Sequence, residues 1–315
     1  METRALGSLQ VSVAGLGCNQ LGTTCDERTS ASIVAAALDQ GVNFFDTADE
    51  YGDGRSEEIV GKALRNHRSK ALIATKFGSR LDNDPRRQGA SARWIATAVE
   101  DSLRRLGTDV IDLYQMHFPD PETPVDETLE ALDRLVKAGK VREIGCCNLD
   151  GPQIDAAMAS ARTRRTKAFA SAQNRLNLLR QESLIDVVPA CERHGLRLLP
   201  FFPLASGMLT GKYRRGEAAP PGSRLRENVA PEIARRMLSD AAFDRIEALE
   251  AYARDHGHAL NELAVAWLAA QPSVASVICG ATRPEQVIEN TKGAHWRLTS
   301  DQAAAATALG HKAIA

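Results

Sequence analysis

Eight short apolar segments recur along this chain of 315 residues, and a stretch with helical periodicity separates most of them from the next. The segments are residues 14–17, 42–45, 71–75, 111–116, 141–145, 169–172, 196–201 and 274–278. Most are almost continuously apolar, which is typical of parallel strands that are buried on both faces. Strands that alternate with helices indicate an α/β fold built around a parallel sheet.

The stretches between these segments have the spacing of amphipathic helices. In residues 92–106 the apolar side chains recur every three or four positions, which places them on one helix face. Residues 243–252 and 260–268 show the same spacing. Thr123 precedes Pro124, so we expect the threonine hydroxyl to cap a helix whose first residue is the proline.

Eight strands with helices between them predict one (β/α)₈ barrel, a TIM barrel, that spans residues 1–315 as a single domain. An open doubly wound sheet is the alternative, but it would normally show fewer strands and a break between two halves. Residues 4–6 and 10–13 flank a Gly-Ser-Leu turn and predict an N-terminal β-hairpin over one end of the barrel. A long loop, residues 206–232, follows the seventh strand, and loops of that length are usually functional or disordered.

The charge balance argues against nucleic acid as a partner. Lys and Arg number 39 against 40 Asp and Glu, so no basic excess exists to neutralise phosphates. No stretch approaches the ~20 apolar residues that would span a bilayer, and the N-terminus has no apolar run of signal-peptide length. The six cysteines form no CxxC pair, which favours free thiols in a reducing cytoplasm and gives no indication of a metal site.

Polar residues gather where the predicted strands end, which is where barrels of this kind carry their active sites. The second strand runs into Asp46, with Tyr51 in the following loop, and the third and fourth strands end at Lys76 and His117. Each residue alone has a structural explanation, because a strand-end Asp often caps a turn and a lone His is often a hydrogen-bonded structural residue. The four residues together, on adjacent strands, predict a catalytic site.

These four side chains have a clear chemical use. A lysine ammonium beside a tyrosine favours the phenolate, so we expect Lys76 to lower the pKa of Tyr51 from its usual value of about 10. Asp46 would keep that lysine charged and oriented. A tuned tyrosine is a general acid that can protonate a carbonyl oxygen. The alternative is that Lys76 is a covalent nucleophile, as in a Schiff-base lyase or aldolase.

Several sequence blocks resemble those of the aldo-keto reductases, in the same order along nearly the whole chain. The blocks are GVNFFDTADEYGDGRSEEIVGKAL, LYQMHFPD, REIGCCN, SAQNRLNLL, FFPLASGMLTGKY and CGATRPEQVIEN. The resemblance implies a reversible hydride transfer between NAD(P)H and a small aldehyde, ketone or alcohol substrate. It also implies that Asp46, Tyr51, Lys76 and His117 form the catalytic tetrad, with Tyr51 as the proton donor and His117 orienting the carbonyl or assisting the proton.

The same resemblance implies a dinucleotide laid across the barrel mouth. The residues that it assigns to the cofactor are Cys147, Asn148, Gln173, Phe201, Leu204, Ser206, Gly207, Leu209, Gly280, Thr282, Arg283, Gln286, Glu289 and Asn290. Among them, the amides of Asn148 and Gln173 would hold the carboxamide and the ring of Phe201 would stack on the nicotinamide. The segment from Leu204 to Leu209 would line the pyrophosphate, and the last block would bind the adenosine end.

The sequence departs from the family pattern at three of these positions. Cys147 stands where a serine usually helps to hold the carboxamide, and Phe201 stands where a tyrosine is more usual. Gly280 replaces a phosphate-binding lysine of one branch, so a preference for NADP(H) would depend on Arg283 and the helix N-terminus beside it. We expect NADP(H) as the preferred cofactor, with NAD(H) as a possible substitute.

A third reading is a regulatory subunit that keeps this fold and senses the cofactor without turnover. The intact tetrad argues against it. We expect the substrate pocket to be walled by Asn19, Phe77, Phe118 and the segment 80–87.

Overall fold

The computed structural model describes residues 1–81, 84 and 86–311, and within them eight parallel strands form one sheet. The strands are β3 (Ala14–Gly17), β4 (Phe44–Asp46), β5 (Leu72–Phe77), β6 (Ile111–Met116), β7 (Val141–Cys147), β8 (Ser171–Gln173), β9 (Arg197–Leu198) and β10 (Val277–Gly280). Their order is β10-β3-β4-β5-β6-β7-β8-β9. Each predicted strand is present, although several bounds shift by a few residues.

The sheet closes on itself through contacts between its two outer strands. A parallel bridge joins Leu198 to Val274, just before β10, and Leu198 N–H donates to Ser273 O at 2.8 Å. Ala275 N–H in turn donates to Leu198 O at 3.0 Å. The predicted barrel is therefore confirmed. A doubly wound sheet, which has two free edges, does not fit these contacts.

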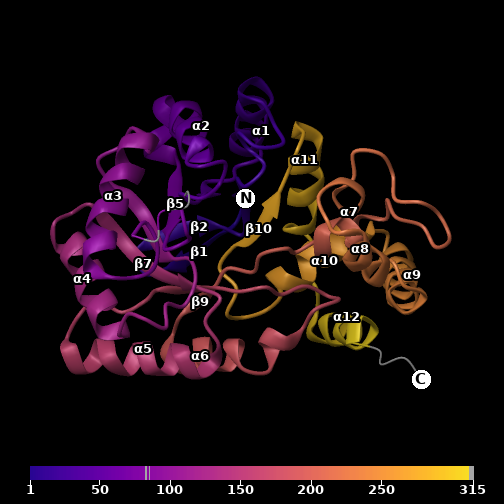
Figure 1. Ribbon diagram of the computed structural model, residues 1–315. Helices are drawn as coiled ribbons and strands as arrows, with labels where there is room; N and C mark the ends of the chain where they lie inside the picture. The colour runs from indigo at the N-terminus through magenta and orange to yellow at the C-terminus, as the bar shows by residue number, and fades with distance from the viewer. Residues whose placement is uncertain (82–83, 85, 312–315) are drawn as a thin grey trace.

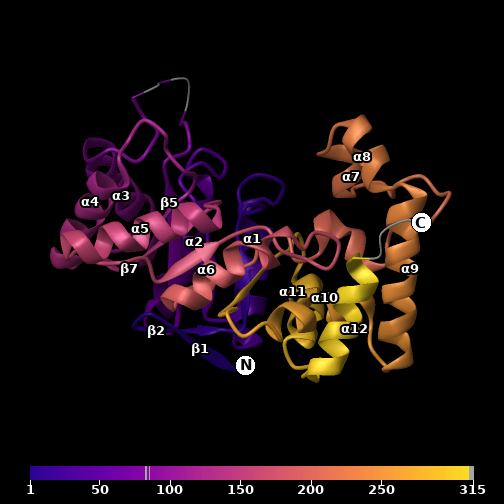
Figure 2. The same cartoon turned by 90° about the horizontal axis from the view of Figure 1, so that it is seen from below.

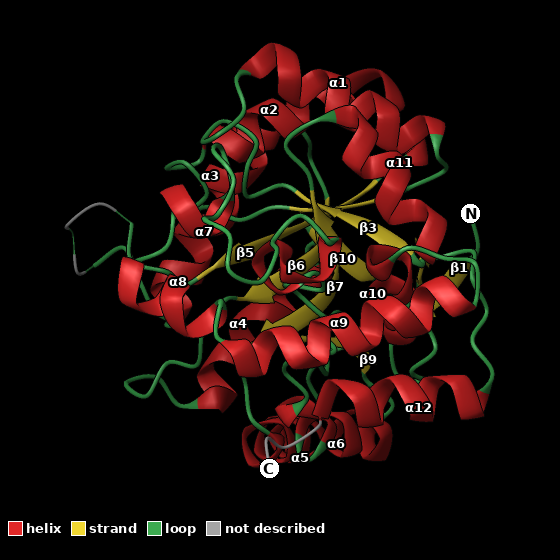
Figure 3. Cartoon of the chain, turned by 90° about the vertical axis from the view of Figure 1, so that its right-hand side faces the viewer, coloured by secondary structure: helices red, strands yellow, loops and turns green. Residues whose placement is uncertain are grey.

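Helices surround the barrel (Figures 1 and 3). Those that follow the strands are α1 (Glu27–Asp39), α2 (Arg55–Leu64), α3 (Ala92–Leu106), α4 (Val125–Lys137), α5 (Gly151–Arg164), α6 (Val187–His194) and α11 (Pro284–Gly293). Additional helices are α9 (Asp240–Asp255), α10 (Leu260–Ala269) and α12 (Ser300–His311), with short 3₁₀ turns η1 (Arg65–Lys70) and η2 (Glu182–Leu184). Their apolar faces pack against the outer surface of the strands in one continuous core. No helix among the described residues is long and apolar enough to cross a membrane.

The predicted N-terminal hairpin consists of β1 (Thr3–Leu6) and β2 (Leu9–Ser12). Its apolar side chains, Leu6, Leu9 and Val11, are buried with residues from the interior of the barrel, among them Phe44 and Leu113. The hairpin therefore closes the N-terminal end of the barrel as expected. This leaves the opposite end for the site.

The connection between β9 and α9 is long, as predicted, but it is not a bare loop. It contains the irregular turn η3 (Ala205–Thr210) and two short helices, α7 (Arg224–Glu227) and α8 (Pro231–Met237). Arg214 and Arg215 anchor it to α9 through ion pairs with Glu250 and Glu247. Figure 2 shows α7 and α8 at the end of the molecule opposite the hairpin.

One predicted helix start is wrong by one residue. Pro124 occupies the cap position of α4, whose first residue is Val125, and no side chain caps this helix. The hydroxyl of Thr123 instead donates to Asp120 Oδ2 at 2.7 Å. A capping hydroxyl would accept from a backbone N–H at the helix start, whereas here the threonine hydroxyl is a donor to a nearby carboxylate.

Candidate active site

Lys76 is the centre of a buried polar cluster at the C-terminal end of the barrel. Its Nζ donates to Asp46 Oδ2 at 2.7 Å, to the backbone oxygen of Thr47 at 2.8 Å and to Tyr51 Oη at 3.2 Å. The side chain is fully buried. The three hydrogens of the ammonium therefore each have an acceptor, which fixes the position of the nitrogen.

The second carboxylate oxygen of Asp46 is also occupied. Gln115 Nε2 donates to Oδ1 at 3.1 Å, and Gln173 Nε2 donates to the same atom at 2.9 Å. Asp46, Gln115 and Gln173 come from strands β4, β6 and β8. The carboxylate is thus held from the far side of the barrel as well as by its neighbour Lys76.

Tyr51 is a neutral phenol in this environment. Burial raises its pKa to about 12, and the charge of Lys76 offsets this only in part. We expected Lys76 to lower the pKa of Tyr51 below its usual value, and that prediction is wrong in direction. The loss of solvent around the hydroxyl outweighs one neighbouring ammonium, whose charge Asp46 partly cancels. A neutral phenol is the form that can donate a proton.

Lys76 and His117 have pKa values shifted in opposite directions. Burial alone would lower the pKa of Lys76, but the negative charge of Asp46 and its hydrogen bond to the ammonium raise that pKa above its ordinary value. Burial and the nearby Lys76 charge lower the pKa of His117 to about 2. The cluster therefore contains a permanent ammonium and a neutral imidazole across the working pH range.

His117 lies beside Tyr51, with 5.9 Å between the ring centroids in an edge-on arrangement. Its Nδ1 is 3.2 Å from Ser79 Oγ and 3.5 Å from Glu50 Oε1. Asn148 Nδ2 donates to the backbone oxygen of His117 at 2.9 Å. The four predicted catalytic residues are thus close together, linked through Lys76 and Tyr51.

The predicted carboxamide residues lie at the ends of the next two strands. Asn148 has a positive φ of 60°, and its backbone N–H donates to Gln173 O at 3.0 Å. Cys147 is buried, and all six cysteines are free. Gln173 directs its amide nitrogen to Asp46, so its amide oxygen is the atom left for a ligand.

The predicted pyrophosphate segment is η3 and the residue before it. Ser206 and Gly207 both have positive φ, 58° and 92°, so the backbone here forms an irregular turn. Leu204 is half-buried, whereas Leu209 is fully buried and can present only its backbone. A Cβ at Gly207 would lie 2.8 Å from Lys212 Nζ, so this ammonium rests against the turn.

Phe201 is half-buried beside Phe202, with 5.3 Å between their ring centroids. The guanidinium of Arg224, on α7, lies 4.7 Å from the centroid of the Phe202 ring. Neither Arg224 nor Lys212 has an acidic partner within the described ranges. Sequence reasoning missed both cations, because only the folded connection brings α7 back over the barrel mouth.

The predicted adenosine residues lie at the start of α11. Arg283 is 60% exposed at the cap position of the helix, and its nearest acid is Glu285 at 3.9 Å. Gln286 Oε1 accepts from the backbone N–H of Thr282 at 2.7 Å, so the amide oxygen is already engaged. Asn290 is buried and donates to Gly280 O at 3.3 Å. Gly280 and Glu289 are exposed.

A second buried cluster lies behind the loop that carries Tyr51. Glu57 accepts from Arg105 Nε and from Thr75 Oγ1, both at 2.6 Å. Asp49 is 1% exposed, and neither of its oxygens has a hydrogen-bond partner among the described residues. Burial and the charge of Glu57 raise the pKa of Asp49 to about 8. The sequence alone could not show that Asp49 is buried.

Of the predicted pocket walls, Phe77 is fully buried against Tyr114 and belongs to the core. Phe118 is 46% exposed and stacks on His117 at 4.7 Å, so it is available to a substrate. Asn19 is half-buried. Residues 82, 83 and 85 of the predicted segment 80–87 lie outside the described residues.

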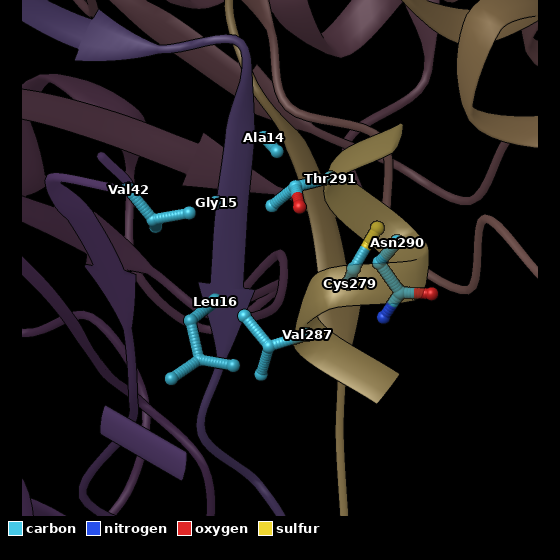
Figure 4. A pocket seen from close by; sticks show the side chains of 8 residues that line it. All are labelled: Ala14, Gly15, Leu16, Val42, Cys279, Val287, Asn290 and Thr291. Carbon is cyan, nitrogen blue, oxygen red and sulfur yellow. The ribbon is translucent and has the colours of Figure 1, made fainter. Parts of the chain in front are cut away.

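A small cavity lies apart from this cluster, between β3 and α11 (Figure 4). Its lining is mostly apolar and includes Leu16, Val42 and Val287. With a volume of about 10 Å³ it holds no more than one water molecule. We regard it as a packing defect behind the strand. Within the described ranges, His, Cys, Asp and Glu form no group that could hold a metal ion.

Comparison with known proteins identifies the family. The model of the Aldo/keto reductase family matches residues 14–310. The chain is 35% identical to the aldo-keto reductase YhdN of Bacillus subtilis over 300 residues, 93% of this chain and 88% of that protein. It is 35% identical to a probable voltage-gated potassium channel subunit beta of Arabidopsis thaliana over 301 residues, 93% of this chain and 90% of that protein.

Among solved structures, the glycerol dehydrogenase of Gluconobacter oxydans matches with a TM-score of 0.84 at 31% identity. The match covers 98% of this chain and 94% of that one. The resemblance seen in the sequence is therefore confirmed over nearly the whole chain, and the chain belongs to the aldo/keto reductase family, as an oxidoreductase of that kind.

Proposed function

We propose that the protein is an NADPH-dependent carbonyl reductase that interconverts a small aldehyde or ketone and its alcohol. One observation carries the proposal: the Lys76 ammonium contacts both Asp46 Oδ2 and Tyr51 Oη, at 2.7 and 3.2 Å. A relative that is a reductase and a structural neighbour that is a glycerol dehydrogenase support this type of redox chemistry. The neighbour's substrate suggests small hydroxylated carbonyl compounds as a first set to test.

Tyr51 would give its proton to the carbonyl oxygen during reduction and recover one during alcohol oxidation. The Lys76 ammonium stabilises the phenolate that forms, because it lies within hydrogen-bond reach of Oη and keeps its charge. Asp46 holds the ammonium in place. His117, which is neutral, borders the carbonyl position on the other side of Tyr51.

The residues at the barrel mouth fit a nicotinamide dinucleotide, which when bound supplies the hydride for reduction and accepts it in oxidation. Asn148 and the free amide oxygen of Gln173 suit a carboxamide, and the half-buried ring of Phe201 suits an aromatic face. Lys212 and Arg224 lack acidic partners in the described parts of the chain and suit the two phosphates.

We assign the preference for NADP(H) to Arg283. Its guanidinium is exposed at the N-terminus of α11, where the helix dipole also favours an anion. The 3.9 Å contact with Glu285 is too long to compete with a bidentate phosphate contact. Because Gln286 and Asn290 already have partners, Arg283 is the main candidate to read a 2′-phosphate.

A covalent role for Lys76 is a poorer fit. A Schiff base requires the neutral amine, whereas this nitrogen donates to three acceptors and its pKa is raised. The regulatory reading has one observation in its favour, the similarity to a probable potassium channel subunit beta. Turnover separates it from the reductase proposal.

The test is consumption of NADPH with a panel of aldehydes, ketones and sugars, for the parent and for Tyr51→Phe. The reductase proposal predicts turnover of at least one carbonyl class, with a loss of about 10²–10⁴-fold in the variant. Tight NADPH binding without turnover of any carbonyl would favour the regulatory reading. Borohydride trapping of a substrate on Lys76 would favour the Schiff-base reading instead.

A further inference from the structure

Two glutamine side chains donate to one carboxylate oxygen inside the barrel. Gln115 Nε2 lies 3.1 Å from Asp46 Oδ1, and Gln173 Nε2 lies 2.9 Å from the same atom. All three side chains are buried, and Asp46 is ion-paired with Lys76. A carboxylate only accepts hydrogen bonds, so the atom that each glutamine turns toward it must be the amide nitrogen. Asp46 therefore sets the orientation of both amides.

The two glutamines differ in where the remaining amide oxygen lies. Gln115 Oε1 is sealed inside the protein and has no hydrogen-bond partner among the described residues. Gln173 is the last residue of β8, at the barrel mouth. Its Oε1 also has no partner in the described part of the chain, but this atom is not sealed off from solvent. Asp46 thus determines that Gln173 presents an acceptor, and not a donor, at the mouth.

A second amide at the mouth is oriented in the same way. Asn148 Nδ2 donates to the backbone oxygen of His117 at 2.9 Å. A backbone carbonyl also only accepts, so the side-chain oxygen of Asn148 is the atom left for a ligand. The backbone N–H of Asn148 donates to Gln173 O at 3.0 Å, which keeps the two residues side by side. The ends of β7 and β8 therefore present two acceptors, which suit a group with two N–H donors.

We propose that Asp46, acting through Gln173, makes the site select the amino group of the cofactor's carboxamide. The inference rests on the proposed function, in which a nicotinamide dinucleotide binds at the barrel mouth. The carboxamide nitrogen has two hydrogens, one for each free oxygen of Gln173 and Asn148. A ring substituent without N–H donors would leave both oxygens without a partner. Asp46 is then a positioning residue for the cofactor as well as the partner of Lys76.

The test is the ratio of the dissociation constants of NADP⁺ and of its 3-acetylpyridine analogue, in which a methyl group replaces the amino group of the carboxamide. In the parent the analogue should bind roughly a hundredfold more weakly, about tenfold for each unpaired oxygen. Asp46→Asn should lower this discrimination at least about tenfold. The asparagine has one oxygen, which the Lys76 ammonium takes, so its nitrogen faces the two glutamines and turns their amides over.

Gln115→Met is the matched control, because it removes the other hydrogen bond to Asp46 Oδ1 and leaves the carboxylate in place. Its ratio should equal that of the parent. Gln173→Leu removes the amide itself and should lower the ratio about as much as Asp46→Asn does. This variant keeps its ion pair, so it tests the proposal even if Asp46→Asn does not fold.

The proposal is overturned if the parent binds both dinucleotides equally, or if Asp46→Asn or Gln173→Leu keeps the ratio of the parent. It is also overturned if Gln115→Met lowers the ratio as much as Asp46→Asn, because any disturbance of Asp46 would then have the same effect. The measurement requires no turnover. A protein that binds neither dinucleotide contradicts both the reductase proposal and this inference, whereas one that reduces carbonyls with NADPH but does not discriminate against the analogue contradicts only this inference.

Discussion

Lys76 Nζ lies 2.7 Å from Asp46 Oδ2, and the two side chains, 0% and 3% exposed, come from neighbouring strands of the barrel. Removal of either partner of a buried ion pair strongly destabilises the folded protein, because the remaining partner becomes an uncompensated buried charge. Here the consequence is stronger, since Gln115 and Gln173 also point at Asp46 and hold it in place. We therefore expect stability and the proposed catalysis to depend on the same contact.

Replacing Lys76 with Met should lower both the stability of the protein and its turnover. We expect a loss of about 3–5 kcal/mol in the free energy of unfolding, because Asp46 keeps its burial and loses its cation. Turnover should fall as well, because the phenolate of Tyr51 loses the ammonium beside it. Denaturant unfolding and NADPH consumption measure the two effects.

The matched control is the double variant Lys76→Met with Asp46→Asn. It removes both charges, so it should recover a substantial part of the lost stability while its turnover stays low. If the double variant is no more stable than Lys76→Met alone, the penalty arises from packing and not from an unpaired carboxylate.

Reduction should be almost independent of pH through the neutral range. In the proposed mechanism Tyr51 donates its proton as the neutral phenol, and its pKa of about 12 keeps that form present until strongly alkaline pH. His117, with a pKa of about 2, contributes no acidic limb above that value. We expect a flat profile of kcat/KM for reduction between about pH 6 and about pH 9.

Tyr51→Phe provides the control for that profile. The variant has no phenol at this position, so its residual rate should show no pH dependence from ionisation of a tyrosine. An alkaline decrease centred below about pH 9 in the parent, absent in Tyr51→Phe, would show that Lys76 lowers the tyrosine pKa after all. In that case binding of the cofactor would offset the effect of burial on the pKa of Tyr51.

Asp49 should make the protein less stable as pH rises. Its pKa is about 8 in the folded chain against an ordinary value of 3.8, so the folded state binds the extra proton between these values. The unfolded state binds fewer protons there, and the free energy of unfolding falls with increasing pH until about pH 8. Asp49→Asn removes this ionisation and should raise the melting temperature more at about pH 8 than at about pH 5.

Asp53→Asn is a suitable control, because Asp53 lies in the same turn but is exposed, and Asn tolerates its φ of 53°. It should leave the pH dependence of the melting temperature unchanged. Equal slopes in the parent and in Asp49→Asn would mean that Asp49 is already ionised at neutral pH, paired with Arg105.

The sequence predicted the positions of the four tetrad residues because strand alternation specifies which end of each segment meets the site. Asp46, Lys76 and His117 follow directly from this rule, Tyr51 lies in the loop after the second strand, and the resemblance added the role of each residue. What the sequence could not show is burial. The pKa of Tyr51 was predicted in the wrong direction, since its sign depends on how much solvent the fold removes from the hydroxyl.

The sequence also could not predict the positions of residues that irregular backbone places at the site or in the core. Arg224 reaches the site only because η3 and α7 fold the long connection over the barrel mouth. Leu209 points into the core because Ser206 and Gly207 turn the chain with positive φ. Periodicity describes regular helices and strands, so it contains no information on such turns.

The cofactor preference should depend on Arg283. A guanidinium that holds a phosphate through two charge-assisted hydrogen bonds contributes about 1.5–3 kcal/mol, which is roughly a ten- to hundredfold difference in affinity. NADPH carries that phosphate and NADH does not. Arg283→Ala should therefore weaken NADPH by this factor and leave NADH almost unchanged, as measured by the dissociation constants of both cofactors.

Lys292→Ala is the matched control, because Lys292 is an exposed cation in the last turn of the same helix. It lies nine residues after Arg283, about 13 Å along the helix axis. Lys292→Ala and Arg283→Ala each remove one positive charge from the protein. The Lys292 variant therefore measures how much the overall charge of the protein favours NADPH, the more negative of the two cofactors. If Lys292→Ala and Arg283→Ala weaken NADPH equally, the preference comes from overall charge, and Arg283 does not read the phosphate.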